Sequence, residues 1–448
     1  MSNPFDSRRS EGIVLFTNGD TSYEFFRDLG QGRVGEQVLL AQTRTPQGLG
    51  ACVVLKCVPL PHVADLAEKF QRTRARLEEE VRLAQYLQHP RIARVYGLFE
   101  IPCGLCVALE NVEGLTLNTL LSVAQACGRY FSEAFTLYVG AEVAAALDYA
   151  HTRTDDAGVP LRIVNRDVNP ARIRMSPHGE VRLTDFGVAL SHLAGRLATS
   201  LPRPQGEVLY AAPEMLLGEV VDARADLFSL GLTLLEFATG RHLYDPGHLR
   251  IEDVEARLSK EEREQALAAS VASMVTELPP FAEDAIWCAM AYRSEDVERA
   301  AEGLPVPLRD IIHTLLRRNP AERFATASEV ETVMRARLAQ LGAYTGEDAV
   351  REVQRALVEA GDRLRDFDLP DDEGGITPPM IEDAHADELS TETEPPSEPR
   401  KAIASTRHPD EVTTAPGGGP HRSSKQTPRK DGCPVEGEGG CRGAEEGR

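Results

Sequence analysis

Apolar residues follow two different periods along the chain. Short runs rich in β-branched and aromatic residues, which are typical of strands, come first, at residues 23–29, 51–58, 95–100 and 105–109. Beyond residue 132 the apolar positions recur at helical spacing, as on one face of an amphipathic helix. A charged segment at 64–88 has the same helical spacing. We therefore expect an α+β fold, with a small β-rich part followed by a larger helical part.

Two loops in the helical part each carry an aspartate and lie between short strand-like runs. The first reads Asn165-Arg166-Asp167 and the second reads Asp185-Phe186-Gly187. One carboxylate can accept a proton from an alcohol, and the other can hold a divalent cation against a polyphosphate. Phosphoryl transfer requires this division of labour, because its catalysis depends on positioning and on charge neutralisation.

A glycine-rich stretch with the spacing G-x-G-x-x-G lies between two strand-like runs. Its glycines are Gly30, Gly32 and Gly35. Glycine has no Cβ, so such a loop lets the backbone approach a phosphate closely. Taken alone this signal is weak, because an ordinary hairpin explains the stretch about equally well.

One lysine, Lys56, lies among the apolar residues of the run at 51–58. A lysine in a buried strand is costly unless it is paired, so it needs a carboxylate. Glu78, Glu79 and Glu80, on the charged helical segment that follows, are the candidates.

Together these stretches resemble the eukaryotic-type Ser/Thr protein kinases, which occur in bacteria as Hanks-type kinases. Ala212-Pro213-Glu214, Asp226 at the start of an apolar helix, and Arg323 complete the set in order. These last three features distinguish protein kinases from small-molecule kinases that share the same catalytic loops. The resemblance covers residues 21–340 and implies a protein kinase-like two-lobed fold.

The resemblance also implies the division of the chain. We expect a lead-in at 1–20, an N-lobe at 21–109, a hinge at 110–112, a C-lobe at 113–340 with a long insert at 241–304, a C-terminal helix at 341–368 and a disordered tail at 369–448. The insert is either an extra packed helix or a partner-binding segment. The C-terminal helix either docks on the C-lobe or forms a weak dimer seam. Residues 371–399 carry ten acids and no Lys or Arg, a composition that cannot offset its ordering entropy.

The site residues follow from the same resemblance. Lys56 paired with Glu80, chosen ahead of Glu79 by counting back from the turn at 89–92, would hold the α- and β-phosphates of ATP. Asp167 would accept the hydroxyl proton, and Asp185 would bind Mg²⁺. The remaining expected ATP contacts are Gly30, Gly32, Gly35, Val38, Glu110 and Val112, and the candidate activation-loop phosphosites are Thr199 and Ser200, with Arg166 as their charge partner. Val38 stands one position later than the corresponding valine of the family, and a β-bulge would restore the strand register.

Four positions depart from the family pattern. Asn165 replaces a histidine, Asn169 a lysine and Glu207 a threonine. Arg172 replaces the asparagine that holds a second metal ion. Arginine cannot ligate a cation, and two unit charges ~4 Å apart repel by roughly 4 kcal/mol at an effective dielectric of about 20. Either the second metal is absent, or the guanidinium swings away, or Arg172 itself neutralises phosphate charge.

The expected function is therefore that of a Ser/Thr protein kinase of low activity, which transfers the γ-phosphoryl group of ATP to protein hydroxyls with one Mg²⁺ ion. The alternative is a pseudokinase that acts as a nucleotide-binding or regulatory scaffold for a protein partner. A small-molecule phosphotransferase is a third, weaker interpretation.

Composition narrows the setting. The 448 residues carry a net charge of −21, which argues against non-specific nucleic-acid binding. No apolar run approaches the roughly 20 residues of a membrane span, and no secretion leader is visible, so we expect a cytoplasmic protein. The eight cysteines form no tight framework, and we expect two reduced thiols in the turn at 103–106.

Overall fold

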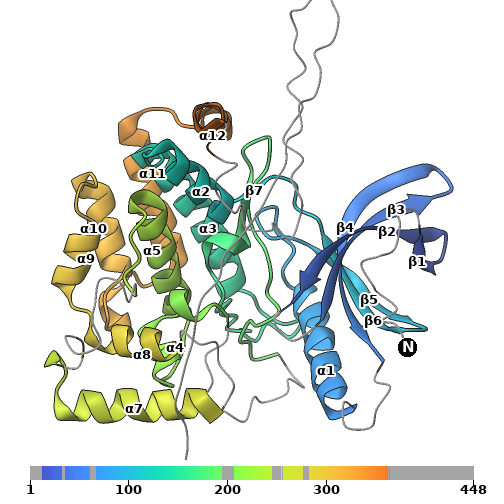
Figure 1. The fold of residues 1–448 in the computed structure, drawn as a ribbon, viewed down its shortest axis with the longest axis horizontal. Coiled ribbons are helices and arrows are strands. Elements are labelled where there is room, and N and C mark those ends of the chain that lie inside the picture. Colours follow the sequence, from blue (N-terminus) through green and yellow to red (C-terminus); the bar gives the residue numbers. More distant parts are fainter. Residues whose placement is uncertain are drawn as a thin grey trace, which may run out of the picture. The chain divides into compact units, whose positions relative to one another are not determined.

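The computed structural model describes residues 13–32, 36–60, 67–193, 206–244, 254, 256–275, 282–361 and 363. All of them belong to the first of two compact units, Met1–Met380. Within this unit a β-rich N-lobe precedes a mostly helical C-lobe, as Figure 1 shows. The predicted α+β, two-lobed fold is confirmed. The expected disordered tail at 369–448 lies outside the described residues.

The N-lobe consists of an antiparallel sheet and one helix. Its strand order is β1-β2-β3-β4-β6-β5. The elements are β1 (Val14–Asn18), β2 (Thr21–Gln31), β3 (Gln37–Thr45), β4 (Gly48–Pro59), α1 (Ala67–Ala84), β5 (Val95–Ile101) and β6 (Gly104–Glu110).

Strand β4 places its residues alternately on the two faces of this sheet. Leu55 and Cys57 belong to a buried cluster that includes aromatic residues of β1 and β2. Val54 and Val58 pack in the cluster on the other face, to which α1 contributes. Lys56 stands between these two valines in the alternation, so its side chain is directed to the face that α1 covers.

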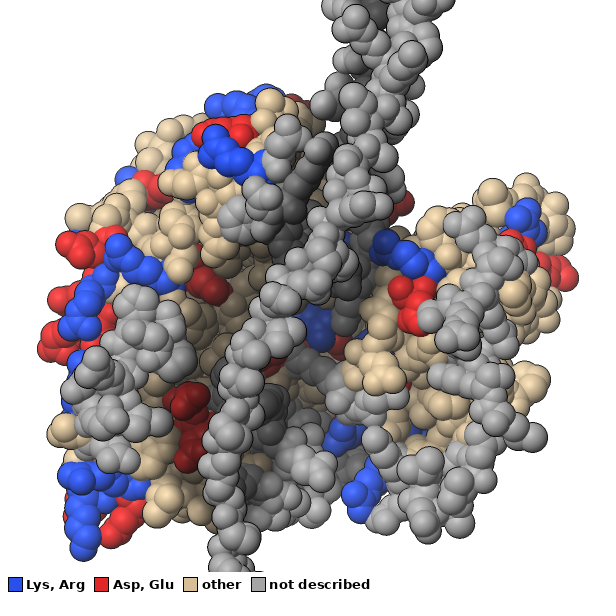
Figure 2. All heavy atoms as spheres, in the orientation of Figure 1, with Lys and Arg blue, Asp and Glu red and all other residues tan. Residues whose placement is uncertain are grey.

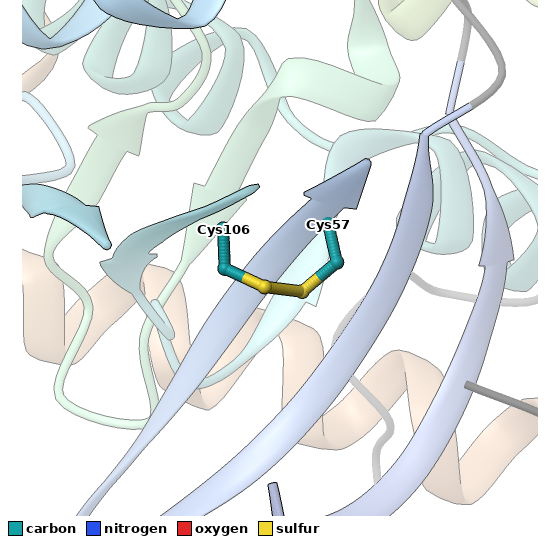
Figure 3. The surroundings of a disulfide bond; sticks show 2 residues. All are labelled: Cys57 and Cys106. Atoms are coloured by element: carbon teal, nitrogen blue, oxygen red, sulfur yellow. A yellow bond between two sulfur atoms is a disulfide. The ribbon is translucent and has the colours of Figure 1, made fainter. Parts of the chain in front are cut away.

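A disulfide joins the middle strands of the sheet. Cys57 of β4 lies directly opposite Cys106 of β6, and the two form the bond drawn in Figure 3. Cys103 is not part of this bond. The expectation of two reduced thiols at 103–106 was therefore wrong, because the partner of Cys106 lies across the sheet, 49 positions earlier in the chain. Local spacing cannot reveal such a pair.

The C-lobe surrounds helix α5, which is buried on almost all sides. A small sheet of β7, β8 and β9 packs against α2 and α3. In Figure 1 its strand β7 lies on the side of these helices that faces the N-lobe. The helices of the C-lobe are α2 (Leu117–Cys127), α3 (Glu133–His151), α4 (Pro213–Leu216), α5 (Arg224–Thr239), α7 (Lys260–Val275), α8 (Ala282–Ala291), α9 (Ser294–Ala300), α10 (Val306–Leu315) and α11 (Ala327–Leu341). The short elements are β7 (Leu115–Thr116), η2 (Pro170–Arg172), β8 (Ile173–Met175), β9 (Val181–Leu183), η3 (Val208–Tyr210) and η4 (Pro320–Glu322).

The long segment at 241–304 contributes α7, α8 and α9 to this lobe. Trp287 of α8 is buried in the main hydrophobic cluster, together with Val254 and Leu258. The described part of the segment is thus packed structure.

A further helix, α12 (Gly346–Ala360), packs against α2 and α3. Val353 and Ala356 on its inner face are buried, and Glu352 accepts hydrogen bonds from the backbone and hydroxyl of Ser132 at the start of α3. The C-terminal helix therefore docks on the C-lobe, one of the two arrangements that the sequence left open.

Charges of both signs are interspersed over the helical lobe on the face shown in Figure 2. Many of them pair, as Arg335 does with Glu331 and Glu142. Among the helices described here, none has the length and apolarity that crossing a bilayer would require.

Candidate active site

A cavity between the two lobes is lined by half of the predicted site residues, namely Val38, Lys56, Glu80, Glu110, Val112 and Asp185. Its apolar lining comes from the N-lobe sheet and the hinge, including Val38, Val54 and Val112. Lys56 and Asp185 supply opposite charges at its inner end. The cavity has a volume of about 80 Å³. An apolar cleft with a few convergent charged groups is the usual form of a ligand site.

Lys56 makes two ion pairs at this inner end. Its Nζ lies 3.2 Å from Glu80 Oε1 and 3.1 Å from Asp185 Oδ1. Of the three candidate glutamates on α1, the structure thus places Glu80 against the lysine. Burial disfavours the charge of Lys56, but Asp185 and Glu80 outweigh that effect and raise its pKa. Burial raises the pKa of Glu80, and the ion pair with Lys56 offsets this only in part, because the negative charge of Asp185 also raises it.

Asp185 is held in a tight turn. Its φ is 64°, and its Oδ1 accepts a hydrogen bond from the backbone of Gly187 at 2.9 Å. Burial opposes its charge, but Lys56 and Arg172 on either side lower the pKa of this carboxyl well below its usual range. Asp185 is therefore ionised at neutral pH and can hold a cation.

The loop with Asp167 is fixed from beneath by α5. Asp226, fully buried in the first turn of that helix, accepts hydrogen bonds from the backbone of Asn165 at 2.7 Å and of Arg166 at 2.8 Å. The Asn165 side chain donates to the backbone carbonyl of Asp185 at 3.1 Å and accepts from the Asp167 backbone at 2.9 Å. Asn165 thus ties the two aspartate loops together, a role that the sequence analysis did not predict.

Asp167 is surrounded by hydrogen-bond donors. Its Oδ1 accepts from Asn169 Nδ2 at 3.0 Å and from the backbone of Glu207 at 2.8 Å. Its Oδ2 lies 3.0 Å from Arg172 Nε. The backbone amide at 207 therefore contacts Asp167, where the family commonly uses a threonine hydroxyl. Asn169 is buried and is directed at Asp167.

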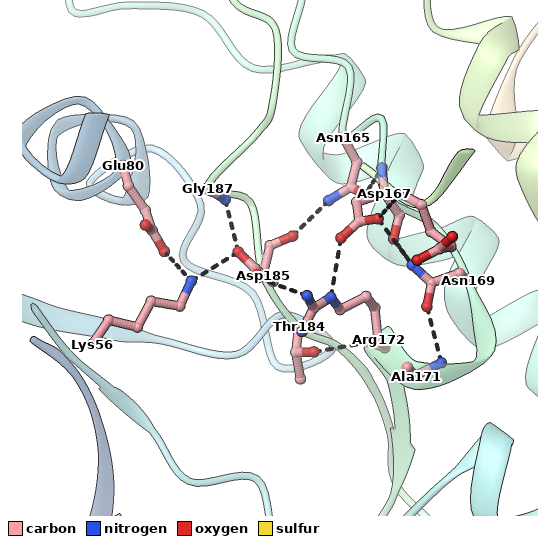
Figure 4. Close-up of polar contacts among 11 residues, drawn as sticks. Lys56, Glu80, Asn165, Asp167, Asn169, Ala171, Arg172, Thr184, Asp185 and Gly187 are labelled. Atoms are coloured by element: carbon pink, nitrogen blue, oxygen red, sulfur yellow. Dashed lines mark hydrogen bonds and ion pairs between the residues drawn. The ribbon is translucent and has the colours of Figure 1, made fainter. Parts of the chain in front are cut away.

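Arg172 links the two aspartates, as Figure 4 shows. Besides its contact with Asp167, its Nη2 lies 3.5 Å from Asp185 Oδ2. The side chain is 12% exposed and lines the cavity. In the described structure the guanidinium has therefore not swung away. It stands between the proton acceptor and the cation ligand that the sequence predicted.

The glycine loop is described in part. Gly30 has φ 98°, and Gly32 donates its backbone N–H to Glu36 O at 2.7 Å, which closes the hairpin. Gly35 lies outside the described residues. Strand β2 has a bulge between Asp28 and Gly30, and Val38 reaches the cavity.

The hinge follows β6. Glu110, Asn111 and Val112 all line the cavity. The Glu110 side chain forms an ion pair with Arg182 and accepts from the Arg94 backbone at 3.0 Å, so it is committed to the hinge itself. The backbone of the hinge remains the part suited to the edge of a nucleotide base.

The candidate phosphosites Thr199 and Ser200 lie outside the described residues. Arg166, their expected charge partner, donates from Nε to the carbonyl of Val188 at 2.8 Å. Farther along, Glu214 and Arg323 form a buried two-pronged ion pair, with distances of 2.7 and 2.8 Å.

Arg174 of β8 is a site residue that the sequence analysis missed. It is 6% exposed and lines the cavity from the C-lobe side. The signal was present in the sequence, because Arg174 stands between the apolar residues Ile173 and Met175 in a strand-like run.

The sequence matches the protein kinase domain family over residues 23–334, which is well over half of the chain. The chain belongs to the protein kinase family. The membership expected from the aspartate loops, Lys56 and Glu214 is therefore confirmed.

Three curated kinases are similar to this one. The chain is 32% identical to the tyrosine-protein kinase MasK of Myxococcus xanthus over 232 residues, 51% of this chain and 34% of MasK. It is 28% identical to the serine/threonine-protein kinase PknJ of Mycobacterium tuberculosis over 311 residues, 68% of this chain and 44% of PknJ. It is 29% identical to Aurora kinase A-B of Xenopus laevis over 219 residues, 49% of this chain and 48% of the relative. The similarity thus spans less than half the length of each of these relatives.

Proposed function

We propose that this protein is a Ser/Thr protein kinase of low turnover, which transfers the γ-phosphoryl group of ATP to a hydroxyl of a protein substrate. The observation that carries the proposal is the arrangement of Lys56 between Glu80 and Asp185 in one interlobe cavity, with Asp167 one side chain away. A chain with no use for ATP would have no reason to keep these four groups together.

Each charged group has a chemical task in this proposal. Lys56, held by Glu80, neutralises the α- and β-phosphates. The substrate hydroxyl oxygen attacks the γ-phosphorus, the bond to the β-phosphate oxygen breaks, and ADP leaves. Asp167 accepts the hydroxyl proton on Oδ2, since Asn169 and the backbone of Glu207 hold its Oδ1 in place.

The donor set fits one Mg²⁺ ion, which when bound neutralises phosphate charge. The ionised carboxylate of Asp185 is the group that would hold it. The residues present do not suit a second ion, because the guanidinium of Arg172 lies between the carboxylates of Asp167 and Asp185 that would hold it. A guanidinium cannot ligate a cation, and at ~4 Å even a unit charge would be repelled by roughly 4 kcal/mol.

The same arginine favours a second candidate function, that of a pseudokinase. Arg172 engages both aspartates, and a scaffold that regulates a protein partner would tolerate that arrangement permanently. A kinase must release at least Oδ2 of Asp167 when substrate binds.

Phosphate incorporation from labelled ATP discriminates between these functions. We expect the purified full chain to phosphorylate itself slowly, and Asp167→Asn to incorporate at least about a hundredfold less. Equal incorporation by wild type and Asp167→Asn would end the kinase proposal in favour of the scaffold. Mass spectrometry of the product would show whether Thr199 or Ser200 is modified and whether any tyrosine is.

The proposed substrate is a protein Ser or Thr, and the proposed location is the cytoplasm, where ATP is available. PknJ is named a Ser/Thr kinase and MasK a tyrosine kinase, so the choice of hydroxyl rests on the resemblance of the loops. In the cytoplasm the Cys57–Cys106 pair would be subject to reduction.

A further inference from the structure

A buried cation forms part of the wall against which a nucleotide base would lie. Arg174 lies in the middle of β8, paired with Thr116 of β7 and Arg182 of β9. It lines the interlobe cavity opposite Val54 of β4 and is only 6% exposed. A base that enters from the hinge therefore meets an arginine on one side and a branched aliphatic side chain on the other.

The guanidinium is anchored at the exit of the hinge. Arg174 Nη2 donates to the backbone carbonyl of Gly114 at 2.9 Å. Gly114 lies so close to β8 that a Cβ there would be 1.9 Å from Met175 O, and its φ of 114° also favours glycine. The backbone after the hinge is thus pressed against β8, and the hydrogen bond holds the arginine beside it.

The space that remains is small. The cavity measures about 80 Å³, whereas sites for small molecules and cofactors usually measure roughly 300–1,000 Å³. Val54 and Arg174 approach this space from opposite lobes, so each sets part of its height. A purine base bound there would contact both side chains.

The charge of the Arg174 guanidinium also opposes binding of a base. A guanidinium loses its remaining access to water when a flat base covers it, and this desolvation of a charge is unfavourable. Stacking of the base on the guanidinium would return part of that cost. That gain is available only after the side chain has left the space that the base needs.

We propose that Arg174 limits nucleotide affinity in this protein by occupying part of the base pocket. The proposal rests on the proposed function only in taking this cavity as the ATP site. Arg174 is thus an affinity-determining residue for the purine base, and Val54 reinforces it from the other wall. The nucleotide binds in competition with the hydrogen bond between Arg174 and Gly114.

Calorimetric titration of the full chain with ATP in excess Mg²⁺ tests this. We expect Arg174→Leu to bind ATP at least about tenfold more tightly than wild type, and Val54→Ala about threefold more tightly. Arg351→Leu is the matched control, because it likewise removes one arginine, but from an exposed position on α12 that does not line the cavity. It should stay within about twofold of wild type.

Either of two results would overturn the proposal. One is that Arg174→Leu binds ATP no more tightly than wild type, which would make the arginine a stacking platform. The other is an equal gain in Arg351→Leu, which would make the effect one of net charge. Should Arg174→Leu lose its cooperative thermal transition, Arg174→Met and Val54→Ala decide, and no gain in either would refute occlusion.

The proposal about Arg174 and the kinase proposal can be refuted independently of each other. Equal phosphate incorporation by wild type and Asp167→Asn would refute phosphoryl transfer, yet a tighter Arg174→Leu would still support the occluded pocket. Phosphoryl transfer by wild type, together with no gain in ATP affinity in Arg174→Leu, would support the kinase proposal and refute the occluded pocket.

Discussion

Arg172 Nε lies 3.0 Å from Asp167 Oδ2, so the residue that departs most from the family pattern contacts the proposed proton acceptor directly. Its Nη2 is also 3.5 Å from Asp185 Oδ2. One guanidinium therefore occupies the space between the two aspartates. Under the proposed kinase function, the rate of phosphoryl transfer depends on how readily that contact opens.

Arg172→Asn should raise phosphate incorporation by about tenfold or more, because it frees Asp167 and restores a cation ligand. The rate of the variant should also rise further with Mg²⁺ at concentrations where that of wild type is saturated. Arg172→Lys, which keeps the positive charge, is the matched control and should remain slow. A variant slower than wild type would show instead that the arginine itself neutralises phosphate charge.

Lys56 should be worth more to stability than a surface lysine, because it is the shared partner of two buried carboxylates. Lys56→Met leaves Glu80 and Asp185 without it and should lower the free energy of unfolding by about 3–5 kcal/mol. Urea denaturation measures this. Adding Glu80→Gln to Lys56→Met should recover part of the loss, since it removes one of the stranded charges. Purely additive losses would mean that the lysine and glutamate do not interact.

The sequence was sufficient to predict the fold, and it also singled out Lys56, Asp167 and Asp185, whose catalytic roles stay predictions, because their signals are local. A lysine inside an apolar strand, and an aspartate on a short loop between strands, can each be accommodated in only a few structural environments. The choice of Glu80 among three adjacent glutamates needed a count from a neighbouring turn, and the geometry of α1 bears on it directly.

Other features depended on which strands become neighbours. Cys57 pairs with Cys106 only because β4 lies beside β6, an adjacency that spacing along the chain does not contain. From the sequence alone Arg174 is an ordinary strand residue, and only the position of β8 in the fold shows that it lines the cavity. Whether Arg172 swings away or bridges the aspartates is a matter of rotamer and partner, which sequence reasoning had left open.

Glu142 of α3 should make stability depend on pH in the acid range. It pairs with Arg91 and, at 2.8 Å, with Arg335 of α11. Burial acts to raise the pKa of Glu142, but hydrogen bonds from the two arginines outweigh it, so the pKa falls below its ordinary value of 4.5. A lowered folded-state pKa stabilises the protein above the unfolded value, and this contribution is lost as pH falls through the folded value.

Glu142→Gln should therefore lower the free energy of unfolding by about 1–3 kcal/mol at neutral pH. The difference from wild type should shrink as the pH falls below about 4.5, because protonation then removes the same charge from Glu142. Denaturant titrations at several pH values measure this. Glu331→Gln removes the other partner of Arg335, in a more exposed i,i+4 pair, and should cost only about 0.3–0.5 kcal/mol. A pH-independent deficit in Glu142→Gln would contradict the assignment.

The disulfide between Cys57 and Cys106 should make the stability of the protein sensitive to reductant. It closes a loop with a sequence separation of 49 residues, for which chain entropy gives roughly 2–4 kcal/mol. Wild type should unfold at lower urea concentration in the presence of dithiothreitol, and Cys57→Ala should show no such shift. Cys103→Ala, which removes a cysteine outside this bond, should respond to reductant as wild type does. Identical wild-type curves with and without reductant would mean that the bond does not form in solution.

Glu352 should carry much of the attachment of α12 to the C-lobe. Its carboxylate accepts hydrogen bonds from the backbone and hydroxyl of Ser132 at 2.7 and 2.8 Å and from Tyr344 Oη at 2.9 Å. Ser132 caps α3, so Glu352 also meets the positive end of that helix dipole. Glu352→Ala should lower the free energy of unfolding by about 1–3 kcal/mol. It should also speed proteolysis after residue 344, which mass spectrometry of a limited digest would locate.

Glu347→Ala is the matched control for this experiment, because Glu347 lies on the same helix with its side chain 86% exposed and its nearest cation, Arg351, 3.9 Å away. It should be neutral in both assays. If Glu352→Ala proved equally neutral, the docked position of α12 would not persist in solution. Sedimentation equilibrium would then test the alternative expected from the sequence, in which the apolar face of α12 forms a dimer seam. Val353→Asp should dissociate such a dimer, whereas in a docked helix it should destabilise a monomer.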